Sequence, residues 1–248
     1  MTFLVGFFVA VAVGLTGVGA GSVTAPVLIL LFGTTPVEAV GTSLVYAAVI
    51  KLVVAPLYLW RKQVSLRALT LMCYGGVPGV LAGVILINLL DGKRYENLIL
   101  MLVGATVAIM ALFSLYRAVA KNSPAGGRDR PAWIPWIAAG IGTEVGFSSA
   151  GTGALGSLVL LNLTALPPSQ VVGTSILFGL ILSVIGGGFH LSAGHYNAAI
   201  LWQLLAGGLA GVFVGANLST VLPARPLRIA LSACLSALGM QLCWKAFG

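Results

Sequence analysis

Charged side chains are scarce in this chain of 248 residues, since Asp, Glu, Lys and Arg together make up only 7% of it. Soluble domains carry roughly 25% charged residues, because such groups must cover a surface that faces water. Hydrophobic residues make up 59% of the chain. This composition excludes a water-soluble globular domain, and lipid is the solvent that fits it.

Cysteine and histidine are also rare, with three and two copies. Cys73, Cys234 and Cys243 lie in apolar stretches without a CxxC pair, so neither a disulfide framework nor a cysteine metal site is indicated. His190 and His195 have no cysteine or carboxylate at metal-ligand spacing, and the chain has no HExxH, GxSxG or Walker sequence. We therefore expect no enzyme, no cofactor and no metal.

The net charge is +8, but the basic residues sit in short breaks between apolar runs. This is the positive-inside pattern that orients membrane proteins, and it argues against nucleic-acid binding. The breaks divide the chain into eight apolar segments, at about 3–33, 37–60, 68–90, 97–119, 132–163, 169–192, 198–222 and 227–247.

Six of these segments match the ~20 residues that a membrane-spanning helix needs. The first and fifth are longer, at ~47 Å if each were one helix, and glycines interrupt both near the middle, at 17–21 and 151–153. We interpret each as a helix hairpin whose turn lies at mid-membrane. Non-helical backbone at that depth needs protein or a water-filled cavity beside it. The alternative is one long, kinked and tilted helix.

The two halves of the chain align without gaps at a shift of 132 residues. Matches of glycine, proline and a whole tetrapeptide carry more weight than matches of common apolar residues. They include Gly14 with Gly146, Gly19 with Gly151, Gly21 with Gly153, Pro36 with Pro168, Val-Gly-Thr-Ser 40–43 with 172–175, Gly75 with Gly207, Gly79 with Gly211, and Gly83 with Gly215. The glycines spaced by four form small-xxx-small stripes, typical of close helix packing.

The sequence therefore predicts an all-α integral membrane protein of two homologous repeats, 1–119 and 132–248, joined by a linker at 120–131. Each repeat would hold a glycine-broken hairpin and three transmembrane helices. With hairpins, nine basic loop residues fall on one side and three on the other, and the repeats are inverted. With full spans the split is eight to four and the repeats are parallel. Segment length makes us favour the inverted form.

The return arm of each hairpin would begin just after its glycine turn, with unpaired N–H groups and a positive dipole end that attract anions. Glycine-broken segments at matching places in two halves point to a transporter site. We therefore expect a small anionic substrate near these turns and near the hydroxyls that follow them. The candidate residues are Gly19, Gly21, Ser22, Thr42 and Ser43 in the first half and Gly151, Thr152, Gly153, Thr174 and Ser175 in the second. The alternative is that these hydroxyls bond to carbonyl groups of their own helices.

Two charged residues lie deep within predicted helices, where charge is costly and usually functional. Lys51 is a candidate for attracting an anion, and Glu144 for carrying a coupling proton. An equally weighted alternative is a structural Lys51–Glu144 pair.

The run Gly17-Val-Gly-Ala-Gly-Ser-Val-Thr-Ala-Pro26, followed by Ala-Val-Gly-Thr-Ser at 39–43 and repeated in weaker form in the second half, resembles the sulfite exporter TauE/SafE family of bacterial permeases. The resemblance covers nearly the whole chain. It implies a multi-pass protein of the bacterial inner membrane that exports small sulfur-containing anions such as sulfite or organosulfonates. The residues themselves support a small anion but not sulfur.

Together these observations favour a secondary transporter with alternating access about a mid-membrane site, driven by the proton gradient because no nucleotide motif is present. Two alternatives stay open: a passive anion channel, and a non-transporting membrane subunit of a partner complex. The sequence also leaves the oligomeric state open, with a homodimer as one option.

Overall fold

The computed structural model describes residues 1–16, 20–90, 95–119, 131–218 and 224–247. These ranges form ten α-helices and one short 3-10 helix at Pro131–Trp133, which confirms the all-α prediction for the described residues. The helices are α1 Thr2–Thr16, α2 Ala20–Leu31, α3 Pro36–Trp60, α4 Leu66–Leu89, α5 Glu96–Val119, α6 Ile134–Ser148, α7 Thr152–Leu163, α8 Pro168–Ser192, α9 Ala198–Leu218 and α10 Ala224–Phe247.

Six helices, α3, α4, α5, α8, α9 and α10, are long and apolar enough to cross a membrane. They coincide with the six segments of spanning length, so that prediction is confirmed. Large apolar side chains such as Phe8, Ile109 and Phe213 stand exposed on the outside of the molecule. Such a surface suits contact with lipid rather than with water.

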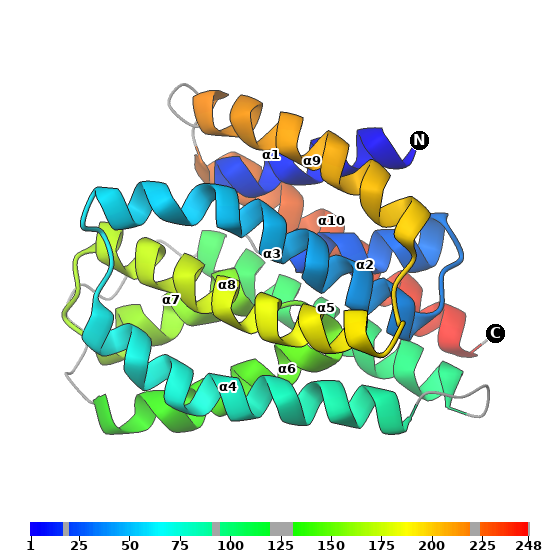
Figure 1. The fold of residues 1–248 in the computed structure, drawn as a ribbon, viewed down its shortest axis with the longest axis horizontal. Coiled ribbons are helices and arrows are strands. Elements are labelled where there is room, and N and C mark those ends of the chain that lie inside the picture. The colour runs from blue at the N-terminus through cyan, green and yellow to red at the C-terminus, as the bar shows by residue number, and fades with distance from the viewer. Residues whose placement is uncertain (17–19, 91–94, 120–130, 219–223, 248) are drawn as a thin grey trace.

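The two overlong segments are each divided into a helix of 15 and a helix of 12 residues. A helix of 15 residues reaches ~22 Å, short of the ~30 Å hydrocarbon core. In Figure 1 the N-terminus of α1 lies toward the same end as the turn from α2 into α3, so the chain doubles back between α1 and α2. The α6–α7 pair doubles back from the opposite end of the molecule (Figure 1).

The break between α6 and α7 depends on two residues with positive φ angles, Ser149 at 61° and Gly151 at 92°. Left-handed backbone ends a helix, and glycine adopts it without the steric cost that a Cβ imposes. The corresponding break in the first segment involves Gly17 and Gly19, which lie outside the described residues. There, only the ends of α1 and α2 are established.

Glycine stripes bring two helix pairs into backbone contact. On α4, Gly75, Gly79 and Gly83 face the main-chain oxygens of Pro135, Ala139 and Thr143 on α6. On α9, Gly207, Gly211 and Gly215 face those of Phe3, Phe7 and Val11 on α1. Both pairs run parallel, and a Cβ at any of these glycines would collide with the neighbouring carbonyl. The four-residue spacing seen in the sequence therefore serves close packing.

We expect Gly79→Ala to lower the free energy of unfolding by about 1–3 kcal/mol, because its methyl group would push α4 away from the Ala139 carbonyl. Gly188→Ala on α8 is the matched control, since a Cβ there meets nothing within 4 Å. Thermal unfolding in detergent would compare the two. Equal melting temperatures would contradict the packing role of the stripe.

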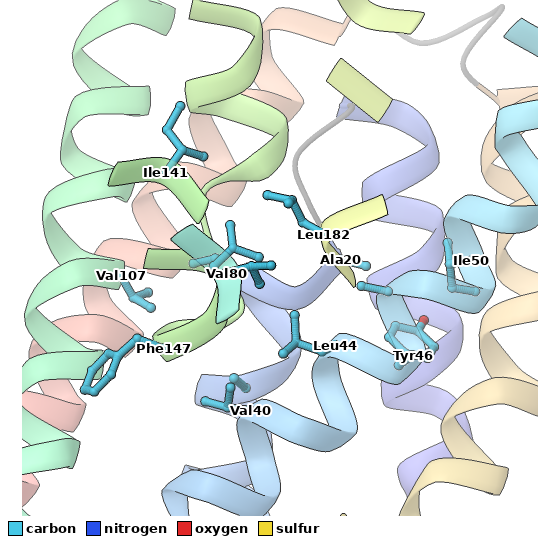
Figure 2. Close-up of a cluster of buried hydrophobic side chains, with 14 of the residues drawn as sticks. Ala20, Val40, Leu44, Tyr46, Ile50, Val80, Val107, Ile141, Phe147 and Leu182 are labelled. Carbon is cyan, nitrogen blue, oxygen red and sulfur yellow. The ribbon is translucent and has the colours of Figure 1, made fainter. Parts of the chain in front are cut away.

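Helices α3 and α8 lie side by side and antiparallel through the centre of the molecule (Figure 1). Gly186 and Gly187 of α8 allow this approach, because they lie against Leu44 and Val45 of α3. Figure 2 shows Leu44 and Tyr46 of α3 gathered with Val80 of α4, Leu182 of α8 and Ala20 at the start of α2, all fully buried. This core holds the first residues of α2 and the second half of α6 next to the central helices.

Helices α5 and α10 form a further close pair. Gly104 lies against Gly239 and Cys243, and the hydroxyl of Ser232 donates a hydrogen bond to that of Ser114 at 3.0 Å. This hydrogen bond links the two helices directly through their side chains. The α5–α10 pair is one wall of the candidate site.

Candidate functional site

The start of α2 and the break between α6 and α7 meet in the interior of the protein. The Ser149 hydroxyl donates a hydrogen bond of 3.0 Å to the carbonyl oxygen of Gly21, and both residues are buried. A Cβ at Gly21 would collide with the Ser149 carbonyl. The start of α2 and the end of α6 are therefore in backbone contact, which only glycine allows at this position.

The N-terminus of α7 lies at this meeting point and has no side-chain cap. Gly151 is its N-cap residue, and the first return hydrogen bond runs from the Leu155 N–H to the Gly151 carbonyl at 2.9 Å. The first N–H groups of a helix have no partner within it. Because these groups also carry the positive end of the helix dipole, they form a ready place for a negatively charged group.

Glu144 reaches this point from the last turn of α6. Its Oε1 accepts a hydrogen bond of 2.6 Å from the Ser148 hydroxyl, whose oxygen accepts in turn from the Ala150 N–H at 3.3 Å. Its Oε2 is buried without a hydrogen-bond partner. A Cβ at Gly151 would collide with Oε2, so the carboxyl group lies directly against the N-cap of α7.

Lys51 bonds to the same helix terminus from the other side. Its Nζ donates to Thr152 Oγ1 at 3.0 Å, to the Gly179 carbonyl at 3.1 Å and to Ser183 Oγ at 3.1 Å. These three bonds use all the donors of an ammonium group. Of the two alternatives that the sequence left open, a structural ion pair with Glu144 is absent, because Lys51 binds hydroxyls and a carbonyl instead.

Serine hydroxyls differ between the two halves. Ser175 donates to the Thr152 carbonyl at 3.3 Å and accepts from Ser157 at 3.2 Å, so it is bonded to α7. Ser43, at the matching position of α3, is fully buried and has no hydrogen-bond partner. The first-half residues matching Thr152 and Ser157 are Ala20 and Ala25, which lack hydroxyls.

The hydroxyls of Thr42 and Thr174 bond to residues outside this meeting point. The Thr42 hydroxyl accepts from the backbone N–H of Asn197 at 3.1 Å, just before α9, and that of Thr174 accepts from Ser65 at 2.9 Å, just before α4. Since α3 and α8 are antiparallel, the two threonines lie toward opposite ends of the central pair. The structure does not bring the two threonines together.

A small cavity opens where the breaks face α5 and α10. Ser22, Ala150, Gly151 and Ala154 line one side, and the opposite wall consists of Val107, Met110, Ala111 and Ser114 of α5 and Leu235 of α10. Its volume is about 20 Å³, enough for about one water molecule. In this conformation the meeting point is closed to a larger solute.

The predicted residues thus fall into three groups, apart from Ser43, which is buried on α3 without a hydrogen-bond partner. Gly21, Ser22, Gly151, Thr152 and Gly153 lie at or beside the meeting point, with Lys51, Ser175 and Glu144 in contact with its helices. Thr42 and Thr174 lie elsewhere, and Gly19 falls outside the described residues. Sequence reasoning missed Ser149 and Ser148. The pair of serines directly before a glycine break was the available signal, because a polar residue at such depth needs a partner.

Comparison with known proteins gives one consistent result. A family profile described as sulfite exporter TauE/SafE matches residues 2–242. The chain is 28% identical over 248 residues to "Probable membrane transporter protein YjnA" of Bacillus subtilis, covering 96% of this chain and 97% of that protein. It is 26% identical to "Probable membrane transporter protein YdhB" of the same organism, covering 93% and 94%.

A "Probable membrane transporter protein" of Xylella fastidiosa is 29% identical over 229 residues, which cover 89% of this chain and 83% of that protein. No solved structure matches the chain significantly.

Proposed function

Because the chain belongs to the sulfite exporter TauE/SafE family, we propose that it is a secondary transporter that carries small anions past the buried contact between its two helix breaks. Membership in this transporter family confirms the expected resemblance and the prediction that the chain is not an enzyme. The substrate, the coupling and the direction are parts of the proposal. In its finer form the substrate is sulfite or an organosulfonate, exported across the bacterial inner membrane.

The observation that carries the proposal is the arrangement around the first residues of α7. An uncapped helix N-terminus lies deep in an apolar protein, beside the ammonium group of Lys51 and the hydroxyl of Thr152. Few uncharged solutes would benefit from such a place, whereas an anion gains from the amides, the dipole and the nearby positive charge. We take Gly21, Ser22, Gly151, Thr152 and Gly153 as the binding surface and Lys51 as the group that positions Thr152.

Alternating access requires two halves that can move against each other, and the proposal treats residues 1–119 and 132–248 as inverted repeats. Its support is a set of contacts that occur twice. If each residue of such a contact is replaced by the residue 132 positions away in the other half, the result is a second contact that the structure also contains. Thr42 bonds to Asn197 as Thr174 bonds to Ser65. Likewise Gly41 lies against the His195 carbonyl as Gly173 lies against that of Gln63.

The contacts between α4 and α6 correspond in the same way to those between α9 and α1. The contact of Gly76 with Phe178 likewise corresponds to that of Gly208 with Tyr46. Lys51 and Ser183, themselves 132 positions apart, bond to each other. Such pairs are expected about an axis between inverted repeats, where transporters hold their substrates.

The small size of the cavity fits one state of this cycle. Its volume of about 20 Å³ is too small for a sulfonate, so binding needs α5 and α10 to move away from Ser22 and Gly151. In the proposed mechanism the α5–α10 pair and the two breaks part on one membrane face at a time.

Purified protein in liposomes provides the test. We expect it to concentrate labelled sulfite or methanesulfonate against a gradient when a pH difference is applied, and to prefer one chemical class over acetate. Flux that only runs downhill and ignores pH would indicate a channel. Absence of flux for every anion in the panel would contradict the proposed function and favour a non-transporting subunit.

A further inference from the structure

The carboxyl group of Glu144 occupies the place that an anion would take. Its Oε2 is buried, has no hydrogen-bond partner and lies against Gly151, the N-cap residue of α7, which provides no side-chain cap. The other oxygen is held by Ser148, whose position is fixed in turn by the Ala150 N–H. A negative group of the protein is therefore already anchored at the positive end of the helix.

Two negative charges at this one helix end would repel each other strongly, because water that could screen them is excluded. The cavity beside Gly151 has room for about one water molecule. The single positive charge of Lys51 cannot balance two negative charges, and its three donors are directed at Thr152, Gly179 and Ser183 rather than at Glu144. An incoming anion therefore benefits when Glu144 loses its charge by taking up a proton.

No other described titratable group forms an ion pair with Glu144. Of the helices that pack against α6, α2 and α7 contain no titratable side chain. The remaining described groups on these neighbours, apart from Lys51, are Glu38, Tyr46 and Tyr58 on α3, Arg67, Cys73 and Tyr74 on α4, Glu96 and Tyr116 on α5, and His190 on α8. Glu144 is thus the acidic group placed to respond to an anion at α7.

We propose that the Glu144 carboxylate is a built-in competitor for the substrate site, so that the anion binds only with a proton on Glu144 and both move in the same direction. Export by such a symporter draws on the outward gradient of the anion, whereas an inward proton gradient alone would drive uptake. The inference rests on the anion site proposed above at α7. Protonation of the carboxylate forms one O–H bond and moves no electrons, and the protonated oxygen becomes a donor to the anion. When the anion leaves on the far side, no second negative charge remains near Glu144. The carboxyl group then gives up its proton on that side and becomes a carboxylate again.

Linkage makes the coupling reciprocal: if a proton strengthens anion binding, the anion strengthens proton binding by the same factor. We expect the apparent affinity for an anion to fall about tenfold per pH unit once Glu144 is mostly charged. In Glu144→Gln the competitor is permanently neutral. Exchange of anion across the membrane should then continue but lose its pH dependence.

Methanesulfonate is the probe of choice, because it stays anionic at every relevant pH and its own protonation cannot imitate the effect. Proteoliposomes containing a pH-sensitive dye receive an inward methanesulfonate gradient without a pH gradient, with potassium and valinomycin to hold the voltage. We expect the lumen of wild-type vesicles to acidify as the anion enters. Alkalinisation, or anion entry without a pH change, would overturn the inference while leaving the transport function intact.

The Glu144→Gln variant is compared in an exchange assay with labelled methanesulfonate, and Glu96→Gln, an exposed glutamate at the start of α5, is the matched control. We expect exchange by Glu144→Gln to vary less than about twofold over a pH range in which wild type and Glu96→Gln vary at least about tenfold. A pH dependence retained by Glu144→Gln would overturn the inference. If wild type moved no anion at all, the proposed function would fail first, and the inference with it.

Discussion

Replacement of Lys51 by methionine should abolish anion transport, with a loss of about a hundredfold or more in the initial rate. Methionine keeps the length and the apolar stem of the side chain but removes the buried charge beside α7. One charge about 4 Å from an anion is worth about 4 kcal/mol at an effective dielectric constant of about 20. The measurement is flux into proteoliposomes at matched protein content.

A measurement of thermal stability distinguishes a loss of anion binding in Lys51→Met from a loss of folded protein. Lys51→Met leaves the buried hydroxyls of Thr152 and Ser183 without the donor that they have in the wild type, which should cost about 1–3 kcal/mol in the free energy of unfolding. Ser183→Ala is the control, because it removes one partner of Lys51 but keeps the charge. We expect Ser183→Ala to melt slightly lower and to transport within a few-fold of wild type. Lys51→Met that transports normally would show that the ammonium group plays no part in anion binding.

Replacement of Gly151 by alanine should strongly impair both stability and transport. The backbone there has a φ angle of 92°, which costs a residue with a Cβ about 1–3 kcal/mol. The new methyl group would also collide with Oε2 of Glu144. We expect loss of transport together with a lower melting temperature in detergent.

Gly140→Ala on α6 is the matched control for Gly151→Ala. A Cβ at Gly140 meets nothing within 4 Å, and its helical backbone suits alanine, so stability should rise by up to about 1 kcal/mol. The double change Gly151→Ala with Glu144→Ala should recover part of the stability, since it removes the collision but not the backbone strain. If Gly151→Ala behaved like Gly140→Ala, the tight contact between the α7 terminus and Glu144 would be refuted.

Much of the architecture could be predicted because membrane-spanning helices are recognisable as apolar runs of a characteristic length. The six spanning segments follow from runs of apolar residues, and the excess length of the other two, with glycines at 151–153, predicted the break that the structure has before Thr152. The four-residue spacing of Gly75, Gly79 and Gly83 likewise predicted a packing face. These features are local, so the sequence carries them directly.

The partners across the site could not be predicted in the same way. Lys51 and Glu144 were the two deep charges, and an ion pair was a reasonable expectation for each. Which residues meet depends on how α3, α6 and α8 are placed, and that is set by contacts such as Gly179 against Lys51. The structural use of Thr42 and Thr174 was hidden for the same reason, since their partners are backbone N–H groups more than a hundred residues away.

Those two threonine bonds also have a mechanical meaning. One bond connects Asn197, the residue before α9, to Thr42 of α3, and the other connects Ser65, the residue before α4, to Thr174 of α8. Because α3 and α8 are antiparallel, the two bonds lie near opposite ends of the central pair. A tilt of α3 against α8 about the Lys51–Ser183 contact would stretch one of these two hydrogen bonds and relax the other. The two central helices would then rotate against each other about a pivot at the ammonium group of Lys51.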